Sequence, residues 1–131
     1  MKKGIFLLLL IVALHYTVNG QTKEEVLRYC DSIGIKHANI VVSQSVLETG
    51  NYQCTKCSLD QNNIFGFIYK GQYLKFDNWQ KSCDYYLRWQ TKHYEDQDYY
   101  SFLNCLWKHK DGRCARYATD LKYTDKLKEL K

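Results

Sequence analysis

Glu48 is the residue whose position best suits acid–base chemistry. It stands in the run Val46-Leu-Glu-Thr-Gly50, at the carboxyl end of the most apolar predicted helix in the chain. Burial disfavours an ionised carboxylate, and the negative end of a helix dipole acts in the same direction. Both effects raise the pKa towards neutrality, as a general acid requires. The alternative is a glutamate that points into solvent at a frayed helix end.

Cysteines are the second group that could do chemistry, and there are six, at positions 30, 54, 57, 83, 105 and 114. An even number in a small exported domain favours disulfides. Zinc is the alternative, because Cys54-x-x-Cys57 has metal-ligand spacing, but Cys105 and Cys114 are too far apart to complete a usual site. The histidines after residue 20 form no His-x-x-x-His pair. We therefore expect disulfides, with Cys105–Cys114 as the preferred local pair, and no metal or other cofactor.

Two helices are predicted in the stretch that leads to Glu48. Residues 21–33 form the first, with Thr22 as its N-cap and two glutamates in its first turn. The second begins at about residue 37 or 39 and runs to 49, where Gly50 ends it. Because this second helix is apolar nearly all round, we expect it to be the central, buried helix.

The remainder predicts a small β lobe followed by more helices. After a loop at 51–63, residues 65–76 predict a hairpin that turns at Lys70-Gly71. Three further helices are expected: one capped by Asp77 or Asn78, one from about Asp98, and one capped by Asp120 that runs to the end after a loop through Cys114. The predicted fold class is mainly α, a disulfide-stapled helical domain with a small β-hairpin lobe.

The first 20 residues predict an export signal. Lys2 and Lys3 precede an unbroken apolar run, Ile5–Leu14, and Gln21 follows a stretch suited to cleavage. Ten apolar residues span roughly 15 Å as a helix, about half of a bilayer's ~30 Å hydrocarbon core. This favours a cleaved signal over a membrane anchor or a buried N-terminal helix. We expect one domain at 21–131, secreted or periplasmic.

The mature chain is weakly basic. Residues 21–131 contain 17 Lys and Arg against 14 Asp and Glu, a net charge of +3. This suits an anionic polymer such as a cell wall, whereas the scattered basic residues form no stripe of the kind that binds nucleic acid. No long apolar run follows residue 20, so stable membrane insertion is not expected either. We expect a monomer.

Three motifs occur in a fixed order along the mature chain: Gly34-Ile-Lys-His37 with Val42-Ser-Gln-Ser-Val-Leu-Glu-Thr-Gly50, then Asn63-Ile-Phe-Gly66, then Tyr117-Ala-Thr-Asp120. Together they resemble the bacterial glucosaminidase domain, glycoside hydrolase family 73, over nearly all of the mature chain. The resemblance implies a lysozyme-like helical fold with a small β lobe. It also implies cleavage of β-1,4 bonds between N-acetylglucosamine and N-acetylmuramic acid in peptidoglycan strands.

The resemblance assigns roles residue by residue. Glu48 matches the family's catalytic acid, and Tyr117 matches a cleft tyrosine that helps to place the reacting sugar or water. Asn63 and Phe65 belong to the turn that links the β lobe to the cleft floor and are candidate substrate contacts. Gly66 of the same motif is expected to allow a tight turn rather than to touch substrate.

Three more residues are candidate substrate contacts. Gln44 lies one turn before Glu48, so it could face the same cleft or be a polar core residue. Tyr69 and Tyr73 lie on the predicted hairpin and could stack on a sugar ring, or belong to the framework.

The sequence departs from the family at the second carboxylate. Glycosidases usually need one as base or nucleophile, and some family members draw it from the β lobe, but residues 65–76 contain no Asp or Glu. Asp60 is the candidate outside the hairpin, since Asp77 suits a helix cap. We expect the second role to fall to water held by Tyr117 or to the substrate's own acetamido group.

Two other functions remain open at this point. A non-catalytic wall-binding module would keep the cleft without turnover, and the acid-free hairpin favours it. A disulfide-stapled secreted interaction protein would bind no glycan at all.

Overall fold

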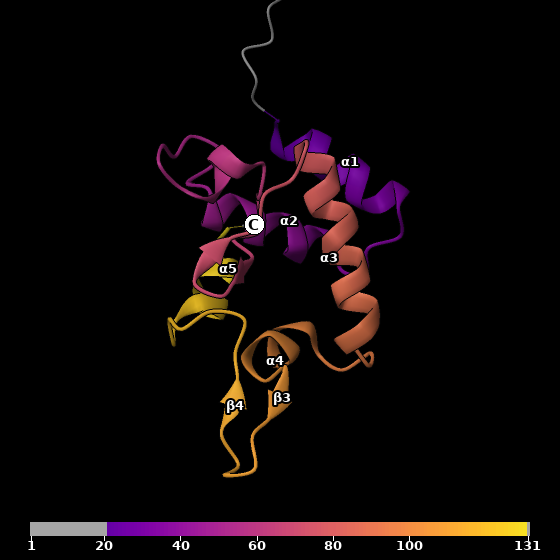
Figure 1. Ribbon diagram of the computed structural model, residues 1–131. Helices are drawn as coiled ribbons and strands as arrows, with labels where there is room; N and C mark the ends of the chain where they lie inside the picture. The colour runs from indigo at the N-terminus through magenta and orange to yellow at the C-terminus, as the bar shows by residue number, and fades with distance from the viewer. Residues whose placement is uncertain (1–20, 131) are drawn as a thin grey trace, which may run out of the picture.

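A computed structural model describes residues 21–130; the expected export signal at 1–20 lies outside them. Within this range five α-helices and two antiparallel two-stranded hairpins follow one another along the chain. Figure 1 shows the helices gathered in the upper part and the second hairpin projecting from the lower end. The predicted fold class, mainly helical with a small β-hairpin lobe and disulfides, is confirmed.

Helix α1 (Lys23–Ser32) begins with a capping box. The Thr22 hydroxyl accepts a hydrogen bond from the Glu25 backbone N–H (3.2 Å), and the Glu25 carboxylate accepts one from the Thr22 N–H (2.8 Å). Both interactions satisfy backbone donors that a helix start leaves unpaired. Val26 and Cys30, which lie one turn apart on the same face of the helix, are fully buried. The predicted first helix is confirmed.

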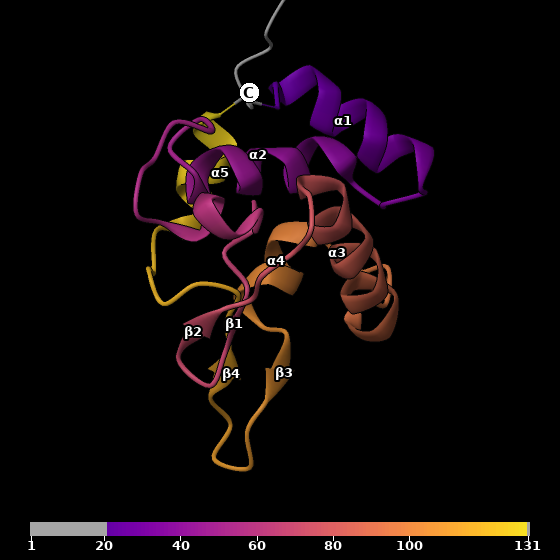
Figure 2. The same cartoon turned by 45° about the horizontal axis from the view of Figure 1, so that its top comes forward.

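Helix α2 (Ala38–Glu48) is the central helix, as predicted. Its middle is buried on all sides, polar residues included, and α1 and α5 pack against it. Figure 2 shows α2 between these two helices. The helix ends at Glu48, and Gly50 follows at φ +54°. This left-handed conformation suits glycine and terminates the helix.

The β lobe lies between α2 and α3. After the short 3-10 helix η1 (Ser58–Gln61), strands β1 (Ile68–Tyr69) and β2 (Gln72–Tyr73) pair in antiparallel fashion. The turn between them, Lys70-Gly71, has positive φ at both positions (+49° and +78°), as a tight primed turn requires. The predicted hairpin and its turn are confirmed.

Helices α3 (Trp79–His93) and α4 (Tyr99–Asn104) are both capped by side chains. The Asn78 carbonyl oxygen accepts from the Lys81 N–H (3.0 Å), which decides between the two predicted caps. Asp98 accepts in the same way from Ser101 N–H (2.9 Å), as expected.

The segment after α4 corrects two expectations. Where a loop was predicted, strands β3 (Trp107–Lys108) and β4 (Cys114–Ala115) form a second hairpin. Its strands are only two residues long and lack the alternating β-branched pattern by which a strand is usually recognised. The last helix, α5 (Tyr123–Glu129), begins later than predicted, because Asp120 is not its cap. The Asp120 carboxylate accepts from the Lys122 N–H (2.9 Å), in the turn before the helix.

Two disulfides are formed, Cys54–Cys57 and Cys105–Cys114. The preferred local pair is thereby confirmed, and the first pair shows that Cys54-x-x-Cys57 closes a loop. Cys30 and Cys83 are buried thiols. Within residues 21–130, no three His, Cys, Asp or Glu side chains gather as a metal ion would need.

A directional chain of hydrogen bonds crosses the core between α3 and α2. The Gln90 amide donates to the Tyr99 hydroxyl (2.9 Å), Tyr99 shares a hydrogen with Tyr86 (2.6 Å), and Tyr86 donates to the Gln44 carbonyl oxygen. The Gln44 amide then donates to the Tyr123 hydroxyl (3.3 Å). Each of these buried polar groups therefore has a partner, which a core of low polarity demands.

Replacing Tyr86 by phenylalanine should destabilise the fold by about 1–3 kcal/mol, because the buried Gln44 oxygen loses its donor. The matched control is Tyr85→Phe on the same helix, since Tyr85 is only half-buried and is not part of this hydrogen-bond chain. Urea unfolding of both variants measures the difference. Equal unfolding midpoints would contradict a stabilising role for this hydrogen-bond chain.

Candidate active site

A cavity of about 390 Å³ opens where α2 ends. This volume lies within the range of ligand sites, about 300–1,000 Å³. Its walls come from α2, α3, the first hairpin with the segment before it, and the segments that flank the second hairpin. The lining residues are Glu48, Gly66, Phe67, Ile68, Tyr73, Trp89, Leu106, Tyr117, Ala118 and Thr119.

Glu48 is the only carboxylate among these lining residues. Its side chain is partly buried, and this burial raises the pKa of the carboxyl above its usual value. A hydrogen bond from the Tyr123 hydroxyl acts in the opposite direction, because it stabilises the ionised form. Desolvation is the larger of the two effects. The site therefore contains a carboxyl that holds its proton to a higher pH than a free glutamate.

Tyr123 also joins Glu48 to the core. Its hydroxyl accepts from Gln44 and is the donor that faces the Glu48 carboxyl. The hydrogen-bond chain that starts at Gln90 therefore ends at the site, with every donor aimed in the same direction. Such an arrangement helps to position the carboxyl at the cavity.

Gly66 packs directly against the Glu48 side chain. A Cβ atom at this position would lie 2.7 Å from the Glu48 Oε2 atom and 3.2 Å from its Cδ atom. The backbone also has φ +70°, which L side chains rarely adopt. Gly66 therefore forms a turn, as predicted, but it also lines the cavity and lets the β lobe pack closely against the carboxyl.

Tyr117 lines the cavity with its hydroxyl group already engaged. The hydroxyl donates to the Phe65 backbone oxygen (2.7 Å), and the ring stacks on Tyr123, with centroids 5.7 Å apart. Burial raises the pKa of Tyr117 well above its usual value, so the phenol stays neutral. Because its only hydrogen points at Phe65, the oxygen can act towards the cavity only as an acceptor.

The structure places the other predicted site residues in three different surroundings. Tyr73 lines the cavity, together with Glu48 and Tyr117. Tyr69, on the same hairpin, is 64 % exposed and does not line it. Gln44 is fully buried, so it is a polar core residue rather than a residue of the cleft.

Asn63 and Phe65 support the site from behind. The Asn63 amide donates to the backbone oxygens of Phe67 (2.7 Å) and Leu74 (3.0 Å), and its own oxygen accepts from the Phe67 N–H (3.0 Å). Asn63 therefore fastens both arms of the first hairpin. Phe65 is buried in the core and packs on Tyr86, with ring centroids 4.7 Å apart. Neither side chain lines the cavity.

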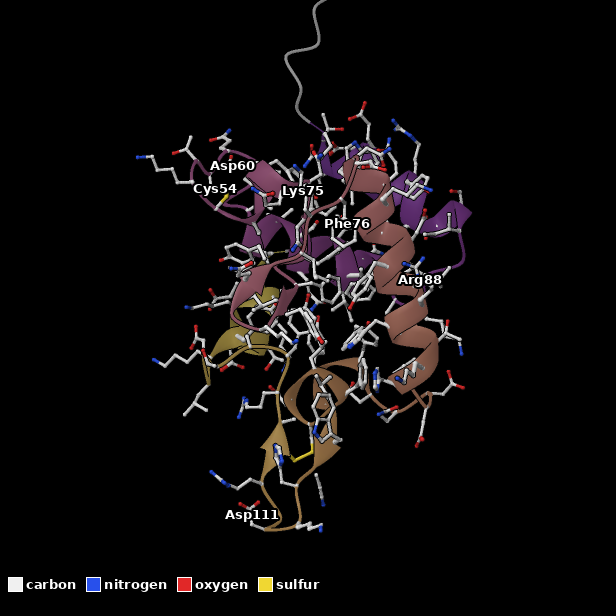
Figure 3. The ribbon with its side chains drawn as sticks, in the orientation of Figure 1. Cys54, Asp60, Lys75, Phe76, Arg88 and Asp111 are labelled. Atoms are coloured by element: carbon white, nitrogen blue, oxygen red, sulfur yellow. A yellow bond between two sulfur atoms is a disulfide. The ribbon has the colours of Figure 1, made fainter. Side chains whose placement is uncertain are left out.

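Asp60 does not line the cavity that contains Glu48. It is an exposed residue of η1. Figure 3 shows it at the upper edge of the molecule, far from the hairpin tip at Asp111.

Several residues of the cavity wall were not predicted from the sequence, above all Trp89 on α3. Its ring lies 5.6 Å from Tyr117 and 5.2 Å from Tyr86, between centroids. A signal for this position exists in the sequence, because Trp89 follows Tyr86 by three positions and so lies on the same face of the helix. Leu106 and Thr119 carried no such signal, since only the second hairpin brings their segments to the cavity.

Fold and site together define a small helical domain in which a partly buried acid faces an aromatic-walled cavity, the arrangement of a glycan-cleaving hydrolase. Comparison with protein families agrees with this class. Residues 23–131 match the model of the glucosaminidase family, described as mannosyl-glycoprotein endo-beta-N-acetylglucosaminidase. The chain belongs to this family, glycoside hydrolase family 73. Searches of curated proteins and of solved structures found no match.

None of the helices within residues 21–130 is both long enough and apolar enough to cross a bilayer.

Replacing Gly66 by alanine should cost more stability than the same change at Gly71. Both positions have positive φ, where a Cβ costs about 1–2 kcal/mol. At Gly71 nothing lies within 4 Å of the added atom, whereas at Gly66 it meets the end of the Glu48 side chain, which must move aside at a further cost of about 1 kcal/mol.

Chemical unfolding measures both variants, alone and with Glu48→Ala. In the Glu48→Ala background the excess cost at Gly66 should disappear, since the clashing atoms are gone. An excess that persists there would mean that the strain at Gly66 has another source.

Proposed function

We propose that this protein is a peptidoglycan hydrolase that cleaves β-1,4 bonds between N-acetylglucosamine and N-acetylmuramic acid, with Glu48 as its general acid. The observation that carries the proposal is the position of Glu48: a carboxyl with a raised pKa, facing an aromatic-walled cavity in a glucosaminidase-family chain. Aromatic faces such as Trp89 and Tyr73 suit the apolar faces of sugar rings.

Glu48 donates its proton to the bridging oxygen as the bond to the anomeric carbon breaks. The leaving sugar then departs as a neutral alcohol, and positive charge develops on the ring that remains. Glu48 is left as an anion, which the Tyr123 hydroxyl stabilises by its hydrogen bond. Burial thus favours the protonated form of Glu48, and the Tyr123 hydroxyl stabilises the anion that remains after proton transfer.

The second catalytic role cannot come from another carboxylate of the lining, because Glu48 is the only one there. The substrate's acetamido oxygen can supply the nucleophile instead, as in known substrate-assisted glycosidases. Alternatively a water molecule attacks, held by the Tyr117 oxygen, whose own hydrogen is committed to Phe65. In both routes Tyr117 acts as an acceptor that orients the reacting groups.

Glu48→Gln should abolish wall hydrolysis while the protein remains folded, since glutamine keeps the shape but has no transferable proton. In the wild type, kcat should fall as pH rises through the raised pKa of Glu48, because the acid must be protonated to act. Release of reducing sugar from purified walls across the pH range measures both effects. Circular dichroism of the variant provides the folding control.

Asp60→Asn tests the absence of a second carboxylate. Turnover should be unchanged, because Asp60 lies outside the cavity lining. Loss of turnover in a folded Asp60→Asn protein would overturn the assignment of the second role to water or substrate.

A non-catalytic wall-binding module is the second candidate function, favoured by the single carboxylate of the lining. Unchanged wall binding without release of reducing sugar by the wild type would select it. We also propose that the protein acts outside the cytoplasm. The two disulfides support this, because such bonds persist in oxidising compartments.

A further inference from the structure

The second hairpin and its flanks carry a net positive charge. Residues 105–118 contain four basic residues and one acidic residue, a net charge of +3, whereas the rest of 21–131 contains thirteen of each. Within this 14-residue stretch, basic residues therefore clearly outnumber acidic ones. Those four residues are Lys108, Lys110, Arg113 and Arg116.

Two of these cations are available to a ligand. Arg113 pairs with Asp111 (2.7 Å), and Arg116 donates to the Asn104 side chain (2.9 Å). Lys108 and Lys110 are exposed and take part in none of the ion pairs found in residues 21–130.

The hairpin continues one wall of the cavity outwards. Leu106, just before β3, and Tyr117, just after β4, both line the cavity. Trp107, which follows Leu106 in the chain, is 50 % exposed, and its ring packs on His93 with centroids 5.9 Å apart. In Figures 1 and 2 the hairpin projects from the body of the molecule. Cys105–Cys114 closes its base, so the hairpin is held in place.

Trp107 and Lys108 are adjacent in β3 and so project to opposite faces of the hairpin, which suits a branched ligand that carries both sugar rings and carboxylates. We propose that the β3–β4 hairpin binds the glycan strand next to the cavity, with Trp107 against a sugar ring and Lys108 and Lys110 paired with carboxylates of the peptide stems. The proposal rests on the function proposed above and adds its substrate class: strands that still carry their acidic stems. Exposed charges of this kind act mainly through electrostatic complementarity.

The test measures wall binding rather than cleavage, so it is independent of catalysis. Every protein carries Glu48→Gln. One variant adds Lys108→Glu and Lys110→Glu, and its control adds Lys56→Glu and Lys75→Glu, which make the same change in net charge. Figure 3 shows Lys75 near the upper edge, opposite the hairpin tip at Asp111.

Binding to purified walls should weaken about tenfold for the hairpin variant and change little for the control. Removal of the peptide stems with an amidase should abolish this difference. The proposal is overturned if both double variants bind equally. It is also overturned if removal of phosphate polymers with hydrofluoric acid, rather than removal of the stems, eliminates the effect of the lysines. Loss of wild-type cleavage would bear on the proposed function alone.

Trp107→Ala gives an independent check on the sugar contact. Its binding should fall on intact and on stem-free walls alike, because the ring contacts sugar rather than peptide. Unchanged binding on stem-free walls would contradict the assigned contact.

A separate observation concerns the two remaining cysteines. Cys30 on α1 and Cys83 on α3 are both fully buried, and their Sγ atoms lie 3.9 Å apart. The other four cysteines are already paired. A small movement of two packed helices would bring these sulfurs to bonding distance, and the disulfide would close a 53-residue separation.

We infer that Cys30 and Cys83 form a third disulfide in the mature protein. The new S–S bond replaces two S–H bonds. The two protons and two electrons pass to a disulfide oxidant, such as a thiol–disulfide oxidoreductase, which is reduced to two thiols.

Mass spectrometry of the exported protein, alkylated in denaturant without reductant, tests this inference. No alkylation should be found on either residue, and a protease digest should contain the linked peptide pair. The matched control is the same protein after reduction, in which all six cysteines should be alkylated. Alkylation of Cys30 and Cys83 before reduction, with the other four protected, would show that the pair stays reduced.

Discussion

Burial of one helix sets the chemistry of this protein. Helix α2 is enclosed along its middle, so its last residue, Glu48, emerges only at the edge of the core. The carboxyl is therefore partly desolvated, and this raises its pKa. Gly66 increases the effect, because the absence of a side chain lets the β lobe lie directly against the carboxyl. A change that exposes the Glu48 carboxyl further to water would lower its pKa towards the usual value.

Polar groups within the core give that acid a fixed position. A core glutamine such as Gln44 would be costly without partners, yet it accepts from Tyr86 and donates to Tyr123. Tyr123 in turn faces Glu48. The same chain of hydrogen bonds thus satisfies buried polar atoms and orients the reactive group. Desolvation and hydrogen bonding act on the carboxyl in opposite directions, and their difference leaves a proton that is held but can be transferred.

The cavity is assembled from segments far apart in the chain. Glu48 comes from α2, Trp89 from α3, and Leu106 and Tyr117 from the two ends of the second hairpin. A domain of this size has a small core, so short connections must be fixed by other means. The Asn63 side chain holds the first hairpin, and the Cys105–Cys114 disulfide holds the second. Rigid connections of this kind allow loops to carry the site.

The sequence by itself determined the elements whose signals are local. Thr22, Asn78 and Asp98 mark helix starts through their own side chains, and Lys70-Gly71 marks a turn through its backbone preference. Glu48 stood out for the same reason, because its place at the end of an apolar helix is visible in the residues beside it.

Only the tertiary structure decided what depends on residues distant in sequence. The second hairpin has two-residue strands without a β pattern, so neither its strand pairing nor its contribution to the cavity wall was predicted. Gln44 lies in the core rather than at the cavity because Tyr86 and Tyr123, 42 and 79 residues away, supply its partners. The absence of Asp60 from the cavity lining likewise follows from the path of the loop at 51–63. Such contacts arise from packing across the whole chain, and no local pattern of residues encodes them.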